Sequence, residues 1–135
     1  MQKKTPDIFL LVFIANYLQR IEGRKRFQKV VFLLKHFYNV SFRYNFMPYL
    51  YGPYCPELQN HIDILVSENV LDVERSNGLF IYRITPIGQE ISKSGETKLR
   101  AEEKQAIIVG LKELSSETTE TLVKRSKKLM RGITG

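Results

Sequence analysis

The sequence of 135 residues contains one cysteine, Cys55, and two histidines, His36 and His61. A single cysteine excludes an internal disulfide, so the fold does not depend on an oxidising compartment and we expect a cytoplasmic protein. These three residues form no metal-ligand or nucleophile set, because no second cysteine or paired histidine completes one. The glycines are scattered at turns and form no phosphate-binding motif. We therefore expect neither an enzyme nor a cofactor.

Long apolar runs are also missing. The run from Ile8 to Ala15 is far shorter than the roughly 20 residues that a membrane span needs. Lys3 and Lys4 before it imitate the start of a signal peptide, but Asp7 interrupts the approach and no small-x-small cleavage site follows. We expect a buried helix here and no membrane association.

Acidic residues are fewer than basic ones, and the net charge is +7. Residues 1–50 hold nine basic and two acidic side chains, residues 51–95 hold three and six, and residues 96–135 hold nine and six. Both ends of the chain are therefore basic and the middle is not. This distribution favours a nucleic-acid partner, because phosphate neutralisation supplies most non-specific affinity. Simple solubility, or a basic proteome, is the alternative.

Two helices are predicted in the first part of the chain. Thr5-Pro6-Asp7 caps the first, which runs to about Arg20. The second begins at Arg24. Its apolar residues follow helical spacing, namely Phe27, Val30, Val31, Leu34, Phe37 and Tyr38. Arg24, Lys25 and Arg26 crowd its first turn, where cations are unfavourable to the helix dipole, which points to a phosphate contact or, equally, to a solvated basic face.

The pattern then changes to period two, because Phe42, Tyr44 and Phe46 alternate with polar residues. This predicts a strand with one aromatic face, which is either a stacking platform for unpaired bases or, more often in a small domain, part of the core. The chain then turns at Gly52 and Pro53, because glycine permits unusual backbone angles and proline removes an amide donor. The aromatic cluster continues into this corner with Tyr49, Tyr51 and Tyr54.

A third helix is predicted from about Cys55 to Glu68, because the proline after Cys55 suits a first helical position. A β hairpin follows it, with strands at residues 71–75 and 79–85 around a Ser-Asn-Gly turn. A short helix then runs from Pro86 to about Ile91.

The segment from Ser92 to Gly95 is the candidate hinge, because it is small and polar. Beyond it, two sparsely apolar helices are expected, and these should dock on the first part or on another subunit. The second of them carries the basic residues Lys124, Arg125, Lys127, Lys128 and Arg131. The fold class is therefore α+β and mainly α, with a domain at residues 1–94 and a C-terminal helical extension at residues 95–135.

Two helices, a strand, a helix and a hairpin give the inventory of a winged helix-turn-helix, with the hairpin as the wing. Specific residues add to this inventory: Gln28-Lys29 in the second helix, Tyr51-Gly52-Pro53 at the corner, and Thr85-Pro86-Ile87-Gly88 after the hairpin. Together they resemble the YwgA-like family and its relatives, the Panacea-type antitoxin domains, over about residues 8–91. The resemblance implies a small cytoplasmic winged helix, in a family with transcription-regulator-like members and toxin-neutralising or adaptor-like members.

The sequence departs from the family at two places. Family members often have serine or threonine after the corner as an ordinary helix cap, whereas this chain has Cys55. Because a helix N-terminus can lower the pKa of a thiol, Cys55 is a candidate reactive thiol, with a plain structural role as the alternative. The aromatic strand and the corner also separate the second and third helices, which a compact helix-turn-helix joins by three or four residues.

The first functional hypothesis is a winged-helix DNA-binding protein, a transcriptional regulator that acts as a homodimer on double-stranded DNA. Polar residues of the third helix would contact base edges, and cations of the second helix and the wing would hold phosphates. The predicted DNA-binding residues are Arg24, Lys25, Arg26, Lys29, Gln59, Asn60, Asp63, Arg75 and Arg83. Against this hypothesis, Glu57, Asp63 and Glu68 bring negative charge toward the DNA.

The alternative hypothesis is a protein-protein interaction module of the antitoxin or adaptor kind. In it, Tyr49, Tyr51 and Tyr54 or the third helix meet a protein such as a toxin. The acidic to neutral third helix suits this hypothesis better, and the basic ends would then face an acidic partner. The two hypotheses differ in whether the basic clusters and the third helix share one face.

Overall fold

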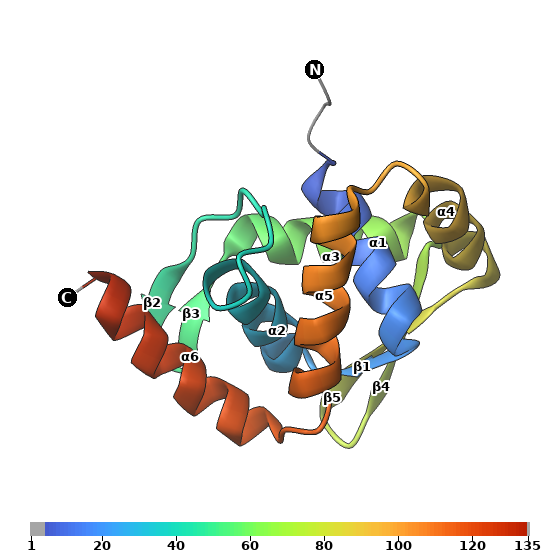
Figure 1. Cartoon of the computed structure of the whole chain (residues 1–135). Helices are drawn as coiled ribbons and strands as arrows, with labels where there is room; N and C mark the ends of the chain where they lie inside the picture. Colours follow the sequence, from blue (N-terminus) through green and yellow to red (C-terminus); the bar gives the residue numbers. More distant parts are fainter. Residues whose placement is uncertain (1–4, 135) are drawn as a thin grey trace.

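The computed structural model describes residues 5–134, and Lys3 and Lys4, which bear on the signal-peptide argument, lie outside this part (Figure 1). The described residues form six helices and two small antiparallel sheets. The helices are α1 (Asp7–Leu18), α2 (Arg24–His36), α3 (Pro56–Ser67), α4 (Pro86–Glu96), α5 (Ala101–Leu114) and α6 (Thr119–Thr134). The α+β, mainly helical class is thus confirmed.

The larger sheet has three strands in the order β1-β5-β4. They are β1 (Arg20–Glu22), β4 (Leu71–Ser76) and β5 (Leu79–Ile84). The hairpin of β4 and β5 agrees with the prediction, whereas β1 was not predicted, because three residues are too few to show a period of two. The smaller sheet is a hairpin of β2 (Met47–Tyr49) and β3 (Gly52–Tyr54), which turns at the predicted corner.

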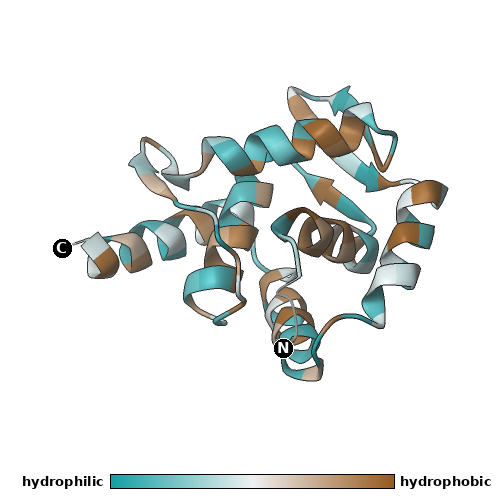
Figure 2. Cartoon of the chain, turned by 90° about the horizontal axis from the view of Figure 1, so that it is seen from above, coloured by the Kyte–Doolittle hydropathy of each residue, from teal (hydrophilic) through white to brown (hydrophobic). Residues whose placement is uncertain are grey.

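The hydrophobic core lies around α1, which is seen in the middle of the fold in Figure 2. Its residues from Leu10 to Ala15 are all buried. The two C-terminal helices contribute to the same core, with Ile107, Leu111, Leu114, Leu122 and Met130. α5 and α6 therefore pack on the rest of the described chain and share its apolar interior.

The strand expected at Phe42 to Phe46 is wrong, because residues 41–46 have no regular secondary structure. Side chains satisfy the backbone there in place of a sheet ladder. Asp7 Oδ2 accepts from the Arg43 N–H at 2.8 Å, and the Lys35 ammonium donates to the Tyr44 carbonyl. The aromatic residues are nevertheless inside, since Phe42 and Tyr44 are buried and their rings stack. Phe42 and Tyr44 are therefore part of the core and do not form a stacking platform for unpaired bases.

The hinge expected at Ser92 to Gly95 is also wrong, because α4 continues through it to Glu96. Small residues are needed here for close packing. A Cβ atom on Gly95 would lie 2.3 Å from Phe9 Cε1 of α1, and Ser92 is buried. The polar, small character of this segment therefore reflects the contact between α4 and α1 and not flexibility.

Gly110 offers a test of the packing of α5 on α2. A Cβ atom at Gly110 would lie 2.6 Å from Leu34 Cδ2, and Leu34 is fully buried. Gly110→Ala should lower the free energy of unfolding by about 1 to 2 kcal/mol, because overpacking outweighs the helix propensity of alanine. Urea denaturation of the purified variant measures this change.

Gly132 in α6 is the matched control, because nothing lies within 4 Å of the Cβ position there. Gly132→Ala should raise the free energy of unfolding by up to about 1 kcal/mol, through helix propensity alone. Equal effects of the two substitutions would contradict the packing of α5 described here.

Candidate functional site

Gln28 and Lys29 hold the corner from the buried side of α2. The Gln28 side chain bonds the Cys55 backbone twice: its Oε1 accepts from the Cys55 N–H at 2.9 Å, and its Nε2 donates to the Cys55 carbonyl at 3.0 Å. Lys29 Nζ donates to the Pro53 carbonyl at 3.0 Å. The Gln-Lys pair therefore satisfies buried backbone groups of the corner, as buried polar groups require.

Lys29 is not placed to contact a phosphate, because its side chain is turned into the protein and it is only 2% exposed. Burial, together with the charges of the nearby Lys25 and Lys127, lowers the pKa of its ammonium to about 8. Within residues 5–134 no carboxylate forms an ion pair with it. Lys29 is therefore a structural residue of the corner, which corrects its assignment to the DNA-binding set.

Gly52 lets α6 pack across this corner. Its φ of +98° lies in the region that favours glycine, and an added Cβ would lie 3.3 Å from Lys29 Cε and 3.5 Å from Lys127 Cγ. The backbone carbonyl of Val123 is 3.8 Å from the same point. Lys127 of α6 is thereby brought beside the start of α2, although it is far away in the sequence.

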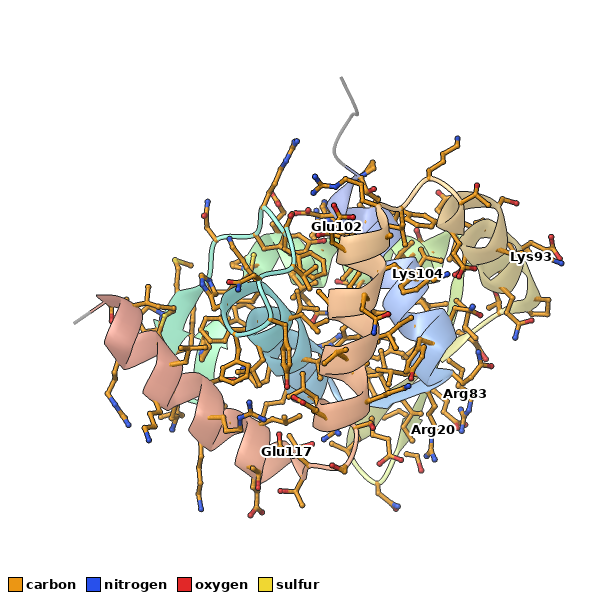
Figure 3. All side chains as sticks on the ribbon, in the orientation of Figure 1. Arg20, Arg83, Lys93, Glu102, Lys104 and Glu117 are labelled. Atoms are coloured by element: carbon orange, nitrogen blue, oxygen red, sulfur yellow. The ribbon has the colours of Figure 1, made fainter. Side chains whose placement is uncertain are left out.

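A cationic surface results, which we call the basic face. Lys25 places its ammonium 4.0 Å from the centre of the Tyr51 ring, at the junction of α2 and the corner. The exposed cations of α6 continue from there, spaced for one face of a helix, and nitrogen-tipped side chains project from the outer side of α6 in Figure 3. The basic face comprises Lys25, Lys124, Lys127, Lys128 and Arg131.

Arg24 and Arg75 extend the cations onto the β4–β5 hairpin. Both guanidinium groups lie over the Phe80 ring, at 4.0 Å and 5.3 Å from its centre. Since Arg24 precedes Lys25 in the chain, the hairpin and the basic face are adjacent. Two residues of the predicted DNA-binding set, Arg24 and Arg75, are thus brought together by an aromatic ring.

Arg83 and the residues of α3 are placed elsewhere. Arg83 pairs with Glu74 at 2.5 Å and lies opposite Arg20 in the sheet, as Figure 3 shows. Gln59 is buried, and its side-chain amide donates to Asp63 Oδ1 at 3.0 Å. Of the three α3 residues in the predicted set, only Asn60 and Asp63 are exposed. α3 packs on α1, α2 and β4, whereas α6 packs on α2 and β3. The basic face is therefore carried by α2 and α6, while the exposed polar residues of α3 lie on a helix without lysine or arginine.

The aromatic corner itself is partly open to solvent. Tyr49 and Tyr51 are 57% and 55% exposed, and Leu50 between them is 77% exposed. Tyr54 is half-buried, and its ring packs edge-on against that of Tyr49 at 5.2 Å. The turn of the β2–β3 hairpin thus presents two aromatic residues and a leucine beside the basic face.

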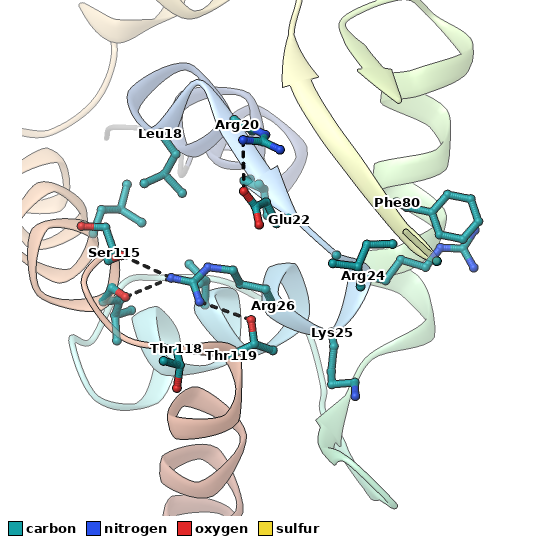
Figure 4. Close-up of a pocket in the computed structure, with 17 residues that line it drawn as sticks. Leu18, Arg20, Glu22, Arg24, Lys25, Arg26, Phe80, Ser115, Thr118 and Thr119 are labelled. Atoms are coloured by element: carbon teal, nitrogen blue, oxygen red, sulfur yellow. Dashed lines mark hydrogen bonds and ion pairs between the residues drawn. The ribbon is translucent and has the colours of Figure 1, made fainter. Parts of the chain in front are cut away.

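Arg26 turns away from the basic face into a pocket of about 750 Å³, drawn in Figure 4. The pocket lies between the start of α2, the tip of the β4–β5 hairpin and the turn from α5 to α6. Arg26 Nη2 donates to the Leu114 and Ser115 carbonyls at 3.3 and 3.5 Å, and Nη1 donates to Thr119 Oγ1 at 3.4 Å. Arg26 therefore faces a cavity, in contrast to the predicted phosphate contact on an open surface.

Cys55 and His61 have structural surroundings. Cys55 is 2% exposed and caps α3 without a side-chain hydrogen bond. His61 is half-buried, and its Nδ1 lies 2.7 Å from the Tyr44 hydroxyl, whose pKa is raised by burial. Among residues 5–134 no group of three or more His, Cys, Asp and Glu side chains is arranged for a metal ion.

Five residues of the site are missing from the predicted set, namely Phe80 and the α6 cations Lys124, Lys127, Lys128 and Arg131. The spacing of Lys124, Lys127, Lys128 and Arg131 predicts one basic helix face, but no local pattern says that this helix packs against Gly52. Phe80 stands between Leu79 and Ile81 in an apolar stretch, so no pattern predicts that its ring contacts two guanidinium groups. Local spacing therefore finds the cations and misses what brings them together.

Lys29→Met tests the buried ammonium. Because the pKa of Lys29 in the folded protein, about 8, lies below its ordinary value of 10.5, the unfolded chain binds more protons between these pH values. Lys29 therefore makes the free energy of unfolding rise with pH in this window. The free energy of unfolding of wild type minus that of Lys29→Met should therefore increase from pH 8 to pH 10.5, as measured by urea denaturation at each pH.

Lys128→Met is the control, because it removes the same charge from an exposed position. Its difference from wild type should show no such growth. Parallel curves for the two variants would mean that Lys29 is not buried as a titrating ammonium.

Comparisons with known proteins return no match. No family model matches the chain, no curated protein matches it, and no solved structure matches its fold. In the part of the chain from residue 5 to residue 134, no helix has both the length and the apolarity to cross a membrane. Inferences about function therefore depend on the geometry of the site.

Proposed function

We propose that the chain is a winged-helix protein that binds double-stranded DNA through the basic face and the adjacent hairpin. The order is α1-β1-α2-β2-β3-α3-β4-β5, with β5 between β1 and β4. Apart from the β2–β3 hairpin between α2 and α3, this is the arrangement expected of a winged helix with β4–β5 as its wing. The resemblance to the YwgA-like family, which stays a prediction, favours the same interpretation.

One observation carries this proposal: a set of cations without ion-pair partners surrounds the start of α2. It consists of Arg24, Lys25, Arg75, Lys124, Lys127, Lys128 and Arg131, and none of them pairs with a carboxylate of residues 5–134. Unpaired cations gathered on α2, β4 and α6 repel one another, and phosphate groups relieve that repulsion while releasing counterions. A polyanion is therefore the partner that this surface favours.

The expected binding is driven by phosphate contacts and tolerates many sequences. α3 exposes Glu57, Asp63 and Glu68 and carries no lysine or arginine, so base readout through Asn60 or Asp63 would bring like charges together. Phosphate contacts position a protein on DNA without reading its sequence. That the protein is a transcriptional regulator and acts as a homodimer stays a prediction. Two copies of the basic face would double the phosphate contacts, which favours a homodimer.

The salt dependence of DNA binding tests the proposal. Lys124→Gln/Lys127→Gln should weaken binding to mixed-sequence duplex DNA by about tenfold or more, because two phosphate contacts are lost. The slope of log affinity against log salt should become shallower by about 2. Fluorescence anisotropy with a labelled duplex at several salt concentrations measures both quantities.

Lys93→Gln/Lys98→Gln is the matched control, because it removes two exposed lysines from α4 and the turn after it. It should leave both the affinity and the slope near the wild-type values. An equal loss of DNA affinity in the two double variants, or a wild-type affinity that does not change with salt, would mean that the basic face is not a DNA site.

A protein partner is the second candidate, favoured by the exposed turn at Tyr49, Leu50 and Tyr51. Aromatic and large apolar side chains beside cations suit an interface with an apolar pocket and an acidic rim. Leu50→Ser separates the two candidates, since phosphate binding has no use for a leucine. A partner retained by wild type and by Lys93→Gln/Lys98→Gln but lost by Leu50→Ser, with DNA affinity unchanged, would favour an antitoxin or adaptor role.

A further inference from the structure

The pocket around Arg26 has the size and the lining of a small-molecule site. Its volume of about 750 Å³ lies within the roughly 300 to 1,000 Å³ of typical ligand sites. Four lining residues are cationic and one is anionic, which gives the lining a charge of 4 − 1 = +3. They are Arg20, Arg24, Lys25 and Arg26, with Glu22 as the single carboxylate. A negatively charged group is therefore favoured inside.

Arg26 is the cation that points into this space (Figure 4), while Arg24 lies against Phe80 at the rim. The three hydrogen bonds of Arg26, at 3.3 to 3.5 Å, are longer than the usual 2.9 to 3.0 Å. The two carboxylates whose charges act on Arg26 are those of Glu22 and Glu117, and both already have ion-pair partners. Glu22 pairs with Arg20 at 3.1 Å, and Glu117 pairs with Arg125 at 2.6 Å. The half-buried guanidinium thus has only neutral acceptors.

Burial lowers the pKa of the Arg26 guanidinium, although the charges of Glu22 and Glu117 act in the opposite direction. A charged group that has lost water and gained only long hydrogen bonds is stabilised by an anion that bonds it in the bidentate geometry of a carboxylate or phosphate.

The rest of the lining is largely apolar. Side chains from α1, β1, the hairpin and α5 form the wall, namely Leu18, Ile21, Leu79, Leu111 and Leu114. Hydroxyl groups of Ser115, Thr118 and Thr119 lie at the turn between α5 and α6, on the side of Arg26. A ligand that fits this lining has a charged end near Arg26 and an apolar body against the leucines.

We propose that this pocket binds a small amphipathic organic anion, with a carboxylate or phosphate group on Arg26 and an apolar or aromatic body against Leu18, Leu111 and Leu114. This site shares Lys25 with the basic face, but the α6 lysines do not line the pocket, and the cation that faces it is Arg26. The proposal therefore does not depend on DNA binding.

Four probes test the ligand class by isothermal titration calorimetry: phenyl phosphate, benzoate, inorganic phosphate and phenol. Phenyl phosphate, benzoate or both should bind, at least about tenfold more tightly than inorganic phosphate, because the ring buries apolar surface. Phenol should not bind, because it lacks the anionic group. Which of the two ring-bearing anions binds more tightly identifies the preferred headgroup. No binding of either ring-bearing anion, or equal binding of phenol, would overturn the proposal.

Thr119→Glu and Thr119→Gln locate the site without removing Arg26. Thr119 is the first residue of α6, where a carboxylate is favourable to the helix dipole, and its Oγ1 is 3.4 Å from Arg26 Nη1. The glutamate should pair with Arg26 and weaken probe binding by about tenfold or more, whereas the isosteric glutamine should not. Melting temperatures of both variants show that they are folded.

Equal probe affinity of Thr119→Glu and Thr119→Gln would place the anion elsewhere and overturn the assignment to Arg26. Lys124→Gln/Lys127→Gln should keep wild-type probe affinity, even where it loses DNA affinity. A loss of probe binding in that double variant would mean that the probe binds the basic face, and would also overturn the pocket. A failure of DNA binding alone leaves these results unaffected.

Discussion

The double hydrogen bond between the Gln28 amide and the Cys55 backbone, with the Lys29 bond to Pro53 beside it, is the constraint on which the rest of the site depends. A buried backbone group without a partner costs roughly 1 to 3 kcal/mol. The corner has such groups because glycine and proline bend the chain there. Side chains of α2 supply the partners, and they fix the start of α3 and the β2–β3 hairpin against α2.

The same constraint explains the distribution of charge. With the corner fixed and no side chain on Gly52, α6 can approach closely, so Lys127 comes near Lys29 and Lys25. Three like charges in one place are unfavourable, and no carboxylate of residues 5–134 pairs with any of them. Local rules are typically broken where a surface is used, because the lost stability is recovered on binding. This is the physical reason for proposing an anionic partner for the basic face.

Sequence patterns predicted the elements whose information is local. Helical spacing found α1, α2 and α3, and turn residues found the β4–β5 hairpin. The patterns failed where a distant residue decides the outcome: Asp7 and Lys35 satisfy the backbone near Tyr44 in place of a strand, and Phe9 explains the small residue Gly95. The candidate site shows the same division. Arg24 and Lys25 were predicted and are exposed, whereas Lys29 and Arg26 are directed inward by partners that spacing does not reveal.

The residues that carry the family resemblance are largely those that build the corner. Gln28 and Lys29 bond its backbone, and Gly52 and Pro53 begin β3 directly after its turn. Their chemistry is fully used inside the protein, so the motif bears on the fold and is silent about the partner. Function must then be argued from side chains whose bonding capacity is not used internally. In residues 5–134 these are the cations of the basic face, the exposed Leu50 turn, and the guanidinium of Arg26, which has three long hydrogen bonds and no counterion.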